Sequence, residues 1–187
     1  MSKGRLFVIS GASGVGKSTV LSRVMAARED LKFSVSATTR QPRPGEVDGV
    51  SYYFVTKEGF EEMIRQDAFL EYDAHMDNYY GTPEKQVEEK LENGSVILDI
   101  DVNGAFNVRK KRADAVLIFI APPSLEELER RLRGRGDTSE AQMQLRLERV
   151  RWETEQAKKY DYIVTNDRVE TCAEEILHII AKICDEE

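Results

Sequence analysis

The chain has 187 residues, and 27 Lys and Arg against 34 Asp and Glu give it a formal net charge of −7 at pH 7. This balance argues against a long nucleic acid or an anionic membrane as a dedicated partner. With 41% apolar residues, twelve glycines and five prolines, the composition is that of a globular chain with a real core, and the length fits one compact unit with small insertions.

The N-terminal segment predicts a buried strand, a glycine-rich loop and a helix in succession. Leu6–Ile9 is a short apolar run typical of a strand buried on both faces, and glycines between positions 11 and 16 end it. From Ser18 onward apolar residues recur at helical spacing, which predicts a helix.

Three further apolar runs predict buried strands: Val96–Ile100, Val116–Ile120 and, with a weaker pattern, Tyr162–Val164. Helical patterns separate them, and strands that alternate with helices form parallel sheets. We therefore predict an α/β protein whose core has three layers, with a parallel sheet between helices.

Two segments depart from this alternation and predict insertions. Residues 33–82 alternate β-branched and aromatic residues with polar ones, and turn signals around Pro42 and Pro44 divide them, so we expect a small α+β subdomain that is partly antiparallel. Residues 124–159 begin with a capping box at Ser124 and carry an arginine-rich run, which predicts a helical lid. The core is then formed by residues 1–32, 83–123 and 160–187.

The glycine-rich loop, Gly-Ala-Ser-Gly-Val-Gly-Lys-Ser at residues 11–18, matches the phosphate-loop pattern at the place its mechanism requires. Glycines let successive backbone N–H groups turn inward around a phosphate chain, and the helix dipole adds to the attraction. We expect Lys17 to reach the β- and γ-phosphates of a nucleotide and the Ser18 hydroxyl to ligate Mg²⁺. The expected nucleotide-binding set is Gly11, Ala12, Ser13, Gly14, Val15, Gly16, Lys17, Ser18 and Thr19. A glycine-rich turn with an exposed lysine is the alternative.

Asp99 and Asp101 lie on or just after the predicted strand Val96–Ile100. Because residues two apart on a strand face the same side, we expect both carboxylates to point toward the phosphate loop. A Mg²⁺ ion with its water shell, or arginines that clamp a phosphate, would give them partners. The alternative is that they cap the next helix, which fits Asp101 better than Asp99.

A phosphate loop is common to ATPases, GTPases, transporter subunits and kinases, so the choice among them depends on other phosphate-binding side chains. Arg40 and Arg43 flank a turn stiffened by prolines, where two planar guanidiniums can grip one phosphate. Tyr52 and Tyr80 add phenolic donors from the same subdomain. Ordinary surface arginines remain the alternative.

A second group of arginines lies in segment 124–159 and predicts a lid that closes over a triphosphate. Arg131 and Arg135 are four residues apart, on one side of a helix, and Arg146 lies on the helix that follows. An arginine placed on the developing charge of a phosphoryl transfer raises the rate by about 10³–10⁵-fold. A solvated helix face is the alternative.

Taken together, these features resemble the guanylate kinases. The resemblance spans nearly the whole chain and rests on the segments Ser36–Glu46, Asn78–Gly81, Ile97–Asp101, Ile120–Ser124, Arg130–Gly136 and Val164–Asp167. It implies that Arg40, Arg43, Tyr52 and Tyr80 hold the phosphate of GMP, that Ser36, Glu71 and Thr82 read guanine with Asp99 in the same network, and that Asn166 contacts the adenine of ATP.

The chemistry of guanine supports the role that the resemblance gives to Glu71. Guanine offers two adjacent donors, N1–H and the 2-amino group, which one carboxylate can accept together, and adenine lacks this pair. An unpaired buried carboxylate would cost several kcal/mol, on the order of the 10⁴-fold discrimination that hydrogen-bonding sites achieve.

The resemblance implies transfer of the γ-phosphoryl group of ATP to GMP or dGMP with Mg²⁺ as cofactor. The catalytic residues of this reaction would be Lys17, Arg40, Arg131, Arg135 and Arg146. The residues that bind the metal would be Ser18, Asp99 and Asp101. No general base is needed, because the attacking phosphate is already ionised near pH 7. Two alternatives stay open: a non-catalytic guanylate-kinase-like interaction module, and a kinase for another monophosphate, against which Glu71 argues.

The remaining expectations concern location and assembly. The two cysteines, Cys172 and Cys184, are too few for a disulfide framework, and they lack the paired spacing that is typical of a zinc site. The longest apolar run, Ala115–Ala121, is far shorter than the ~20 residues of a membrane span, and no signal peptide is visible. We expect a cytoplasmic monomer or homodimer with ATP and GMP or dGMP as partners, and with neither a long nucleic acid nor a membrane.

Overall fold

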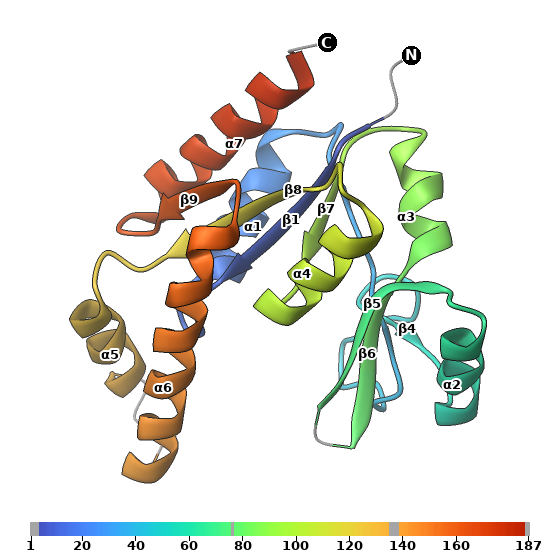
Figure 1. The fold of residues 1–187 in the computed structure, drawn as a ribbon, viewed down its shortest axis with the longest axis horizontal. Helices are drawn as coiled ribbons and strands as arrows, with labels where there is room; N and C mark the ends of the chain where they lie inside the picture. The colour runs from blue at the N-terminus through green and yellow to red at the C-terminus, as the bar shows by residue number, and fades with distance from the viewer. Residues whose placement is uncertain (1–3, 76, 135–138, 186–187) are drawn as a thin grey trace.

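A five-stranded parallel sheet forms the centre of the molecule in the computed structural model, which describes residues 4–75, 77–134 and 139–185 (Figure 1). The strand order is β2-β7-β1-β8-β9, and all four pairings are parallel. The strands are β1 (Leu6–Gly11), β2 (Lys32–Phe33), β7 (Val96–Asp99), β8 (Val116–Ala121) and β9 (Tyr162–Thr165). The predicted parallel α/β core is thereby confirmed, and the four predicted strands begin at the residues expected; only the short edge strand β2 was not foreseen.

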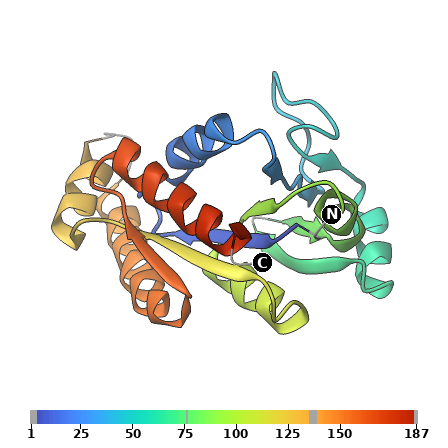
Figure 2. The ribbon, with the colours of Figure 1, turned by 90° about the horizontal axis from the view of Figure 1, so that it is seen from above.

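Helices cover both faces of this sheet, which gives the three layers predicted. Helices α1 (Lys17–Ala27) and α7 (Val169–Asp185) lie on one face, and α4 (Val102–Lys111) and α6 (Glu140–Gln156) lie on the other (Figure 2). Helix α3 (Glu84–Leu91) leads back into the sheet at β7. The strands β1, β7 and β8 are almost fully buried between these layers, as their continuous apolar runs require.

The segment between β2 and α3 forms a second sheet with the order β4-β3-β6-β5. Its strands are β3 (Ala37–Thr38), β4 (Tyr53–Phe54), β5 (Phe69–His75) and β6 (Asn78–Pro83), with α2 (Lys57–Arg65) beside them. Strand β6 is antiparallel to β3 and β5, whereas β3 and β4 are parallel. A separate hydrophobic cluster of Ala37, Phe60 and Phe69 supports this sheet, with the rings of Phe60 and Phe69 stacked 4.4 Å apart.

Residues 124–159 fold into α5 (Leu125–Arg133), α6 and the short 3₁₀ helix η1 (Ala157–Lys159). Ser124 caps α5 as the capping-box pattern predicts, because its hydroxyl accepts a 3.1 Å hydrogen bond from Glu127 N–H. Apolar residues of α5 and α6, such as Leu128, Leu132 and Val150, belong to the same hydrophobic cluster as the sheet. Helices α5 and α6 are therefore packed against the core in this structure.

Within the described residues, no helix is both long and apolar enough to cross a membrane.

Candidate active site

The phosphate loop connects β1 to α1, at the carboxyl end of the central strand of the sheet (Figure 1). Gly14 and Gly16 have φ values of 85° and 93°, which residues with a Cβ rarely adopt. Gly16 is also the N-cap residue of α1, so the backbone turns sharply into the helix whose dipole faces the loop. A hydrogen bond of 3.0 Å from Val15 N–H to the carbonyl of Ala12 closes the turn.

Lys17 is the first residue of α1, and its side chain crosses to the neighbouring strand β7. Its Nζ forms an ion pair with Asp99, the last residue of that strand, and also lies 3.5 Å from the carbonyl oxygen of Ile100. Both side chains are about a quarter exposed. The lysine of the phosphate loop and the expected strand-end carboxylate are thus brought together at the edge of the sheet.

The position of Asp101 differs from the expectation that it shares the orientation of Asp99. Strand β7 ends at Asp99, so the alternation of side chains along the strand does not extend to Asp101. Asp101 is instead the N-cap of α4, and its Oδ1 accepts a 2.8 Å hydrogen bond from Gly104 N–H. Its Oδ2 lies 3.4 Å from a guanidinium nitrogen of Arg149. The capping alternative is correct for this residue.

Asn166 follows β9 and supports the phosphate loop from the side opposite Asp99. Its Nδ2 donates a 2.7 Å hydrogen bond to the carbonyl of Val15, and the residue is 3% exposed. Its Oδ1 is also buried and has no hydrogen-bond partner among the described residues. One side of this amide therefore fixes the loop, whereas the other side retains an unused acceptor.

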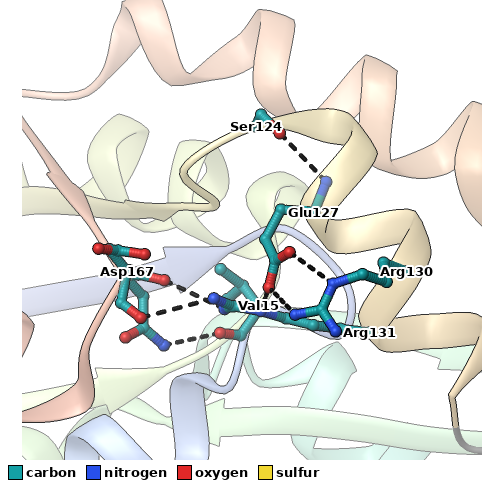
Figure 3. Close-up of polar contacts among 7 residues, drawn as sticks. Val15, Ser124, Glu127, Arg130, Arg131 and Asp167 are labelled. Atoms are coloured by element: carbon teal, nitrogen blue, oxygen red, sulfur yellow. Dashed lines mark hydrogen bonds and ion pairs between the residues drawn. The ribbon is translucent and has the colours of Figure 1, made fainter.

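The side chain of Arg131 extends from helix α5 toward the backbone that follows β9 (Figure 3). Its Nε donates to Glu127 at 2.7 Å, and its Nη1 donates to the carbonyl of Asn166 at 3.1 Å. Hydrogen bonds from Arg130 and Arg131 lower the pKa of Glu127 to about 2. Arg131 is therefore held beside the phosphate loop by groups from two elements.

Of the other two predicted lid arginines, only Arg146 can be placed. Arg146 is exposed on α6, and Arg135 lies outside the described residues.

A cavity of about 160 Å³ separates the end of β7 from the second sheet. It is lined by residues of both parts of the molecule: Ser36, Tyr52, Glu71, Asp73, Tyr80, Gly81, Asp99, Ile100 and Asp101. Five of the eight residues predicted to bind the second nucleotide are among them. The cavity lies next to the phosphate loop, because Asp99 contributes to its wall and also pairs with Lys17.

Glu71 is the buried acidic residue of this cavity, with 9% of its surface exposed. Its Oε1 accepts a 2.6 Å hydrogen bond from the hydroxyl of Thr82 on the paired strand β6. Burial raises the pKa of Glu71 to about 7, against the effect of the Thr82 hydrogen bond, and the charge of Asp101 adds to the increase. A carboxylate in this setting gains most from a ligand that offers it two donors.

Arg40 and Arg43 do not line this cavity, although Arg40 lies against Tyr52, which does. Arg40 forms a bidentate ion pair with Glu46, with both nitrogen–oxygen distances at 2.9 Å, and its guanidinium lies 5.3 Å from the ring centre of Tyr52. The side chain of Arg43 is exposed, and its backbone N–H donates to Glu46 at 2.7 Å. The hydrogen bonds that Arg40 donates to Glu46, with a smaller contribution from Tyr80, raise the pKa of Arg40.

The described residues contain no group of three or more His, Cys, Asp or Glu arranged to hold a metal ion. Ser18 is an exposed residue in the first turn of α1, and Asp99, at the end of β7, pairs with the adjacent Lys17. Both supply hard oxygen atoms, the ligand type that Mg²⁺ prefers, and an Mg²⁺ held mainly by phosphates and water needs few protein ligands. The residues present therefore fit an Mg²⁺ that arrives with a nucleotide.

Three acidic residues of the site region were not singled out from the sequence. Asp73 follows Glu71 by two positions, so the strand period could have placed both on one face. Glu46 ends the motif around Arg40, but nothing in its spacing indicates an ion pair. Glu153 interrupts the apolar stripe of α6 and accepts a hydrogen bond from Ser13 N–H at 2.8 Å. Its partner is 140 residues away, so no local pattern identifies it.

The fold and the site define a phosphate-loop NTPase: a parallel sheet with a phosphate loop after its central strand, flanked by a second ligand cavity. Its backbone is similar to that of a gluconokinase from Sinorhizobium meliloti, with a TM-score of 0.51 over 100% of this chain and 97% of that one. At 14% identity that likeness concerns the fold alone.

Comparisons with known proteins identify the family. The family model described as guanylate kinase matches residues 3–183. The chain is 50% identical to a guanylate kinase of Thermus thermophilus over 95% of this chain and 81% of the relative, and 48% identical to one of Oceanobacillus iheyensis over 95% and 87%. The crystal structure of guanylate kinase from Anaplasma phagocytophilum matches with a TM-score of 0.74 and 34% identity, covering 97% of this chain and 86% of that one. The chain belongs to the guanylate kinase family.

Proposed function

We propose that this chain transfers the γ-phosphoryl group of ATP to GMP or dGMP, giving ADP and GDP or dGDP. The observation that supports this most strongly is the position of Glu71, a buried carboxylate that faces a cavity adjoining Lys17 and Asp99. An acid that reads guanine and a lysine that binds a triphosphate thus lie on either side of the end of β7. This arrangement suits the transfer of a phosphoryl group between two bound nucleotides.

ATP binds along the phosphate loop, from Gly11 to Thr19, in this proposal. The loop N–H groups and Lys17 neutralise the β- and γ-phosphates, and Lys17 exchanges part of its contact with Asp99 for phosphate oxygens. The unused Oδ1 of Asn166 accepts from the 6-amino group of adenine. Arg131, Arg135 and Arg146 complete the lid over the triphosphate.

GMP binds in the cavity between the two sheets. Glu71 accepts from N1–H and the 2-amino group of guanine, while Thr82 orients that carboxylate, and Ser36 donates to O6. Tyr52 and Tyr80 line the cavity on the side of Arg40. The phosphate of GMP competes with Glu46 for Arg40, and the exposed Arg43 closes on the same phosphate.

Mg²⁺ would neutralise the charge of the β- and γ-phosphates, with Ser18 and Asp99 as the nearest protein oxygens. Asp101 is left as the cap of α4, because both of its oxygens have partners within the protein.

Catalysis in this site consists of positioning and charge neutralisation. An oxygen of the GMP phosphate attacks the γ-phosphorus in line, and no residue need remove a proton, since that oxygen is already ionised near neutral pH. Lys17 and the arginines offset the repulsion between two polyanions. Closure of residues 33–82 and of the arginine-rich segment would exclude water and so protect ATP from hydrolysis.

A non-catalytic interaction module is the less favoured alternative. The phosphate loop, Lys17 and the Lys17–Asp99 pair are all present, and the curated relatives matched over 95% of this chain are named as guanylate kinases.

An assay of ADP release with GMP, AMP, CMP and UMP tests the proposal. We expect GMP to be used at least about 10³-fold better than AMP, because adenine lacks the two adjacent donors that Glu71 would accept from guanine. Equal rates with AMP and GMP would contradict the base-reading role of Glu71. Absence of turnover with all four would favour the interaction module.

The proposal includes a cytoplasmic location and a monomer or homodimer that binds neither membrane nor long nucleic acid. The net charge of −7 and the free thiols of Cys172 and Cys184 support it. Light scattering on the purified protein would establish the mass of the assembly.

A further inference from the structure

Glu153 is a buried carboxylate on a helix face that is otherwise apolar. It is 4% exposed and shares the inward side of α6 with Met143, Leu147 and Val150. A buried charge is expensive unless it is paired and hydrogen-bonded, and an apolar side chain of similar size would fill the position at lower cost. The stability of α6 therefore does not explain why an acid occupies this position.

The partners of Glu153 lead to the phosphate loop. Its Oε2 accepts a 2.8 Å hydrogen bond from the backbone N–H of Ser13, in the first half of the loop. Its Oε1 accepts from Nε of Arg149 at 3.0 Å, one helical turn earlier. Arg149 in turn approaches Asp101, the cap of α4, at 3.4 Å. We call Ser13, Glu153, Arg149 and Asp101 the loop brace.

The order of charges along α6 indicates that the role of Arg149 is to pair with Glu153 rather than to stabilise the helix. In pairs four residues apart, an acid that precedes a base stabilises a helix better than a base that precedes an acid. Here the base, Arg149, precedes the acid, Glu153, which is the less stabilising order. Arg149 is half exposed, at 51%, whereas Glu153 is buried. The arginine thus supplies a compensating charge and leaves the second carboxylate oxygen free to accept from the loop.

Resting on the function proposed above, we propose that Glu153 is a positioning residue for ATP. It contacts no substrate; by accepting the Ser13 N–H it holds the first half of the phosphate loop in the conformation that presents the remaining N–H groups to the phosphates. Arg149 orients the Glu153 carboxylate through its hydrogen bond to Oε1. Because the brace acts through the loop, its loss weakens binding of ATP and ADP and leaves guanine recognition at Glu71 unchanged.

Calorimetric titration of the full-length protein with ADP and, separately, with GMP tests this inference without requiring turnover. We expect Glu153→Ala to weaken ADP binding at least tenfold and to leave GMP binding within twofold of the wild type. The ADP affinity of Glu153→Gln should lie between those of Glu153→Ala and the wild type, because the amide oxygen still accepts from Ser13 N–H while the ion pair with Arg149 is lost. Glu155→Ala, an exposed position on the same helix, is the control and should bind both nucleotides as the wild type does.

A variant at the exposed end of the brace keeps the test available if Glu153→Ala does not fold. Arg149→Met retains the length of the side chain and should weaken ADP binding by about two- to fivefold in the same direction. Unchanged ADP affinity in a folded Glu153 variant, or equal losses for ADP and GMP, would overturn the inference. Failure of the wild type to phosphorylate GMP would contradict the proposed function, while the ADP titrations would still decide whether the brace positions the loop.

Discussion

At the scale of single residues, Glu71 combines the chemistry of recognition with a pH dependence. Burial raises its pKa to about 7, so close to half of the unliganded protein carries the carboxyl in its protonated form at neutral pH. Only the ionised form accepts both guanine donors. Protonation of Glu71 therefore competes with GMP binding.

This competition predicts that the affinity for GMP rises with pH. With a pKa of about 7 the ionised fraction increases roughly tenfold between pH 6 and pH 8, so the Kd for GMP should fall by about tenfold over that range. The Glu71→Gln variant, measured by the same calorimetry, controls for ionisation of the GMP phosphate. An equally steep pH dependence in that variant would show that Glu71 is not the titrating group.

Raising the pH has opposite effects on the two properties that Glu71 influences: it strengthens GMP binding and lowers the stability of the folded protein. A folded-state pKa above the unfolded value of 4.5 means that the folded protein binds more protons than the unfolded one at intermediate pH. The contribution of Glu71 to the free energy of unfolding is therefore fully present below about pH 4.5 and is lost as the pH rises through 7.

At the scale of elements, the caps of α5 and α6 set the ends of the arginine-bearing helices. Ser124 accepts from Glu127 N–H at 3.1 Å, and Ser139 accepts from Gln142 N–H at 3.4 Å. Both bonds satisfy a backbone donor that the helix itself leaves unpaired.

Ser124→Ala should lower the free energy of unfolding by about 1 kcal/mol, the usual value for loss of an N-cap. Ser139→Ala is the matched comparison and should cost less, because its bond is longer. Urea unfolding followed by circular dichroism measures both changes. A Ser124→Ala protein as stable as the wild type would mean that solvent replaces the cap at no cost.

At the scale of the whole molecule, two separate hydrophobic clusters support the two substrate regions. The main cluster includes the sheet and parts of α5 and α6, whereas Ala37, Phe60 and Phe69 form the small cluster of the second sheet. The small cluster has only three buried residues among those the structure describes, so we expect the second sheet to open more readily than the core.

Amide hydrogen exchange should show that GMP and ADP each protect a different region of the protein. GMP is expected to slow amide exchange in residues 33–82 by at least about tenfold, since a bound ligand stabilises the region it contacts by mass action. ADP is expected to protect residues 11–19 and to leave the second sheet little changed. Protection of residues 33–82 by ADP as strong as that by GMP would contradict the assignment of separate sites.

Much of the fold and part of the site could be predicted from local patterns. The four apolar runs predicted the starts of β1, β7, β8 and β9, and for β1, β7 and β8 the reason is that strands buried on both faces need continuous apolar residues. The expectation that β9 is buried is wrong, because β9 lies at the edge of the sheet and Ile163 is 50% exposed. The phosphate loop was recognisable because its glycines and lysine have a fixed spacing. The family resemblance assigned five of the nine cavity-lining residues to binding of the second nucleotide, including Glu71, whose surroundings in the sequence indicate nothing unusual.

The sequence by itself thus determined the class of fold and the phosphate loop, since each is recognised from local patterns of residues. The kind of reaction followed from the family resemblance, whose segments extend over nearly the whole chain. Only the tertiary structure decided that Asp101 caps α4, that Arg40 is paired with Glu46, and that Glu153 holds Ser13. The physical reason is that the partner of a carboxylate depends on where a strand ends and which helix packs beside it. Neither can be read from spacing when the two groups are 140 residues apart, as Ser13 and Glu153 are.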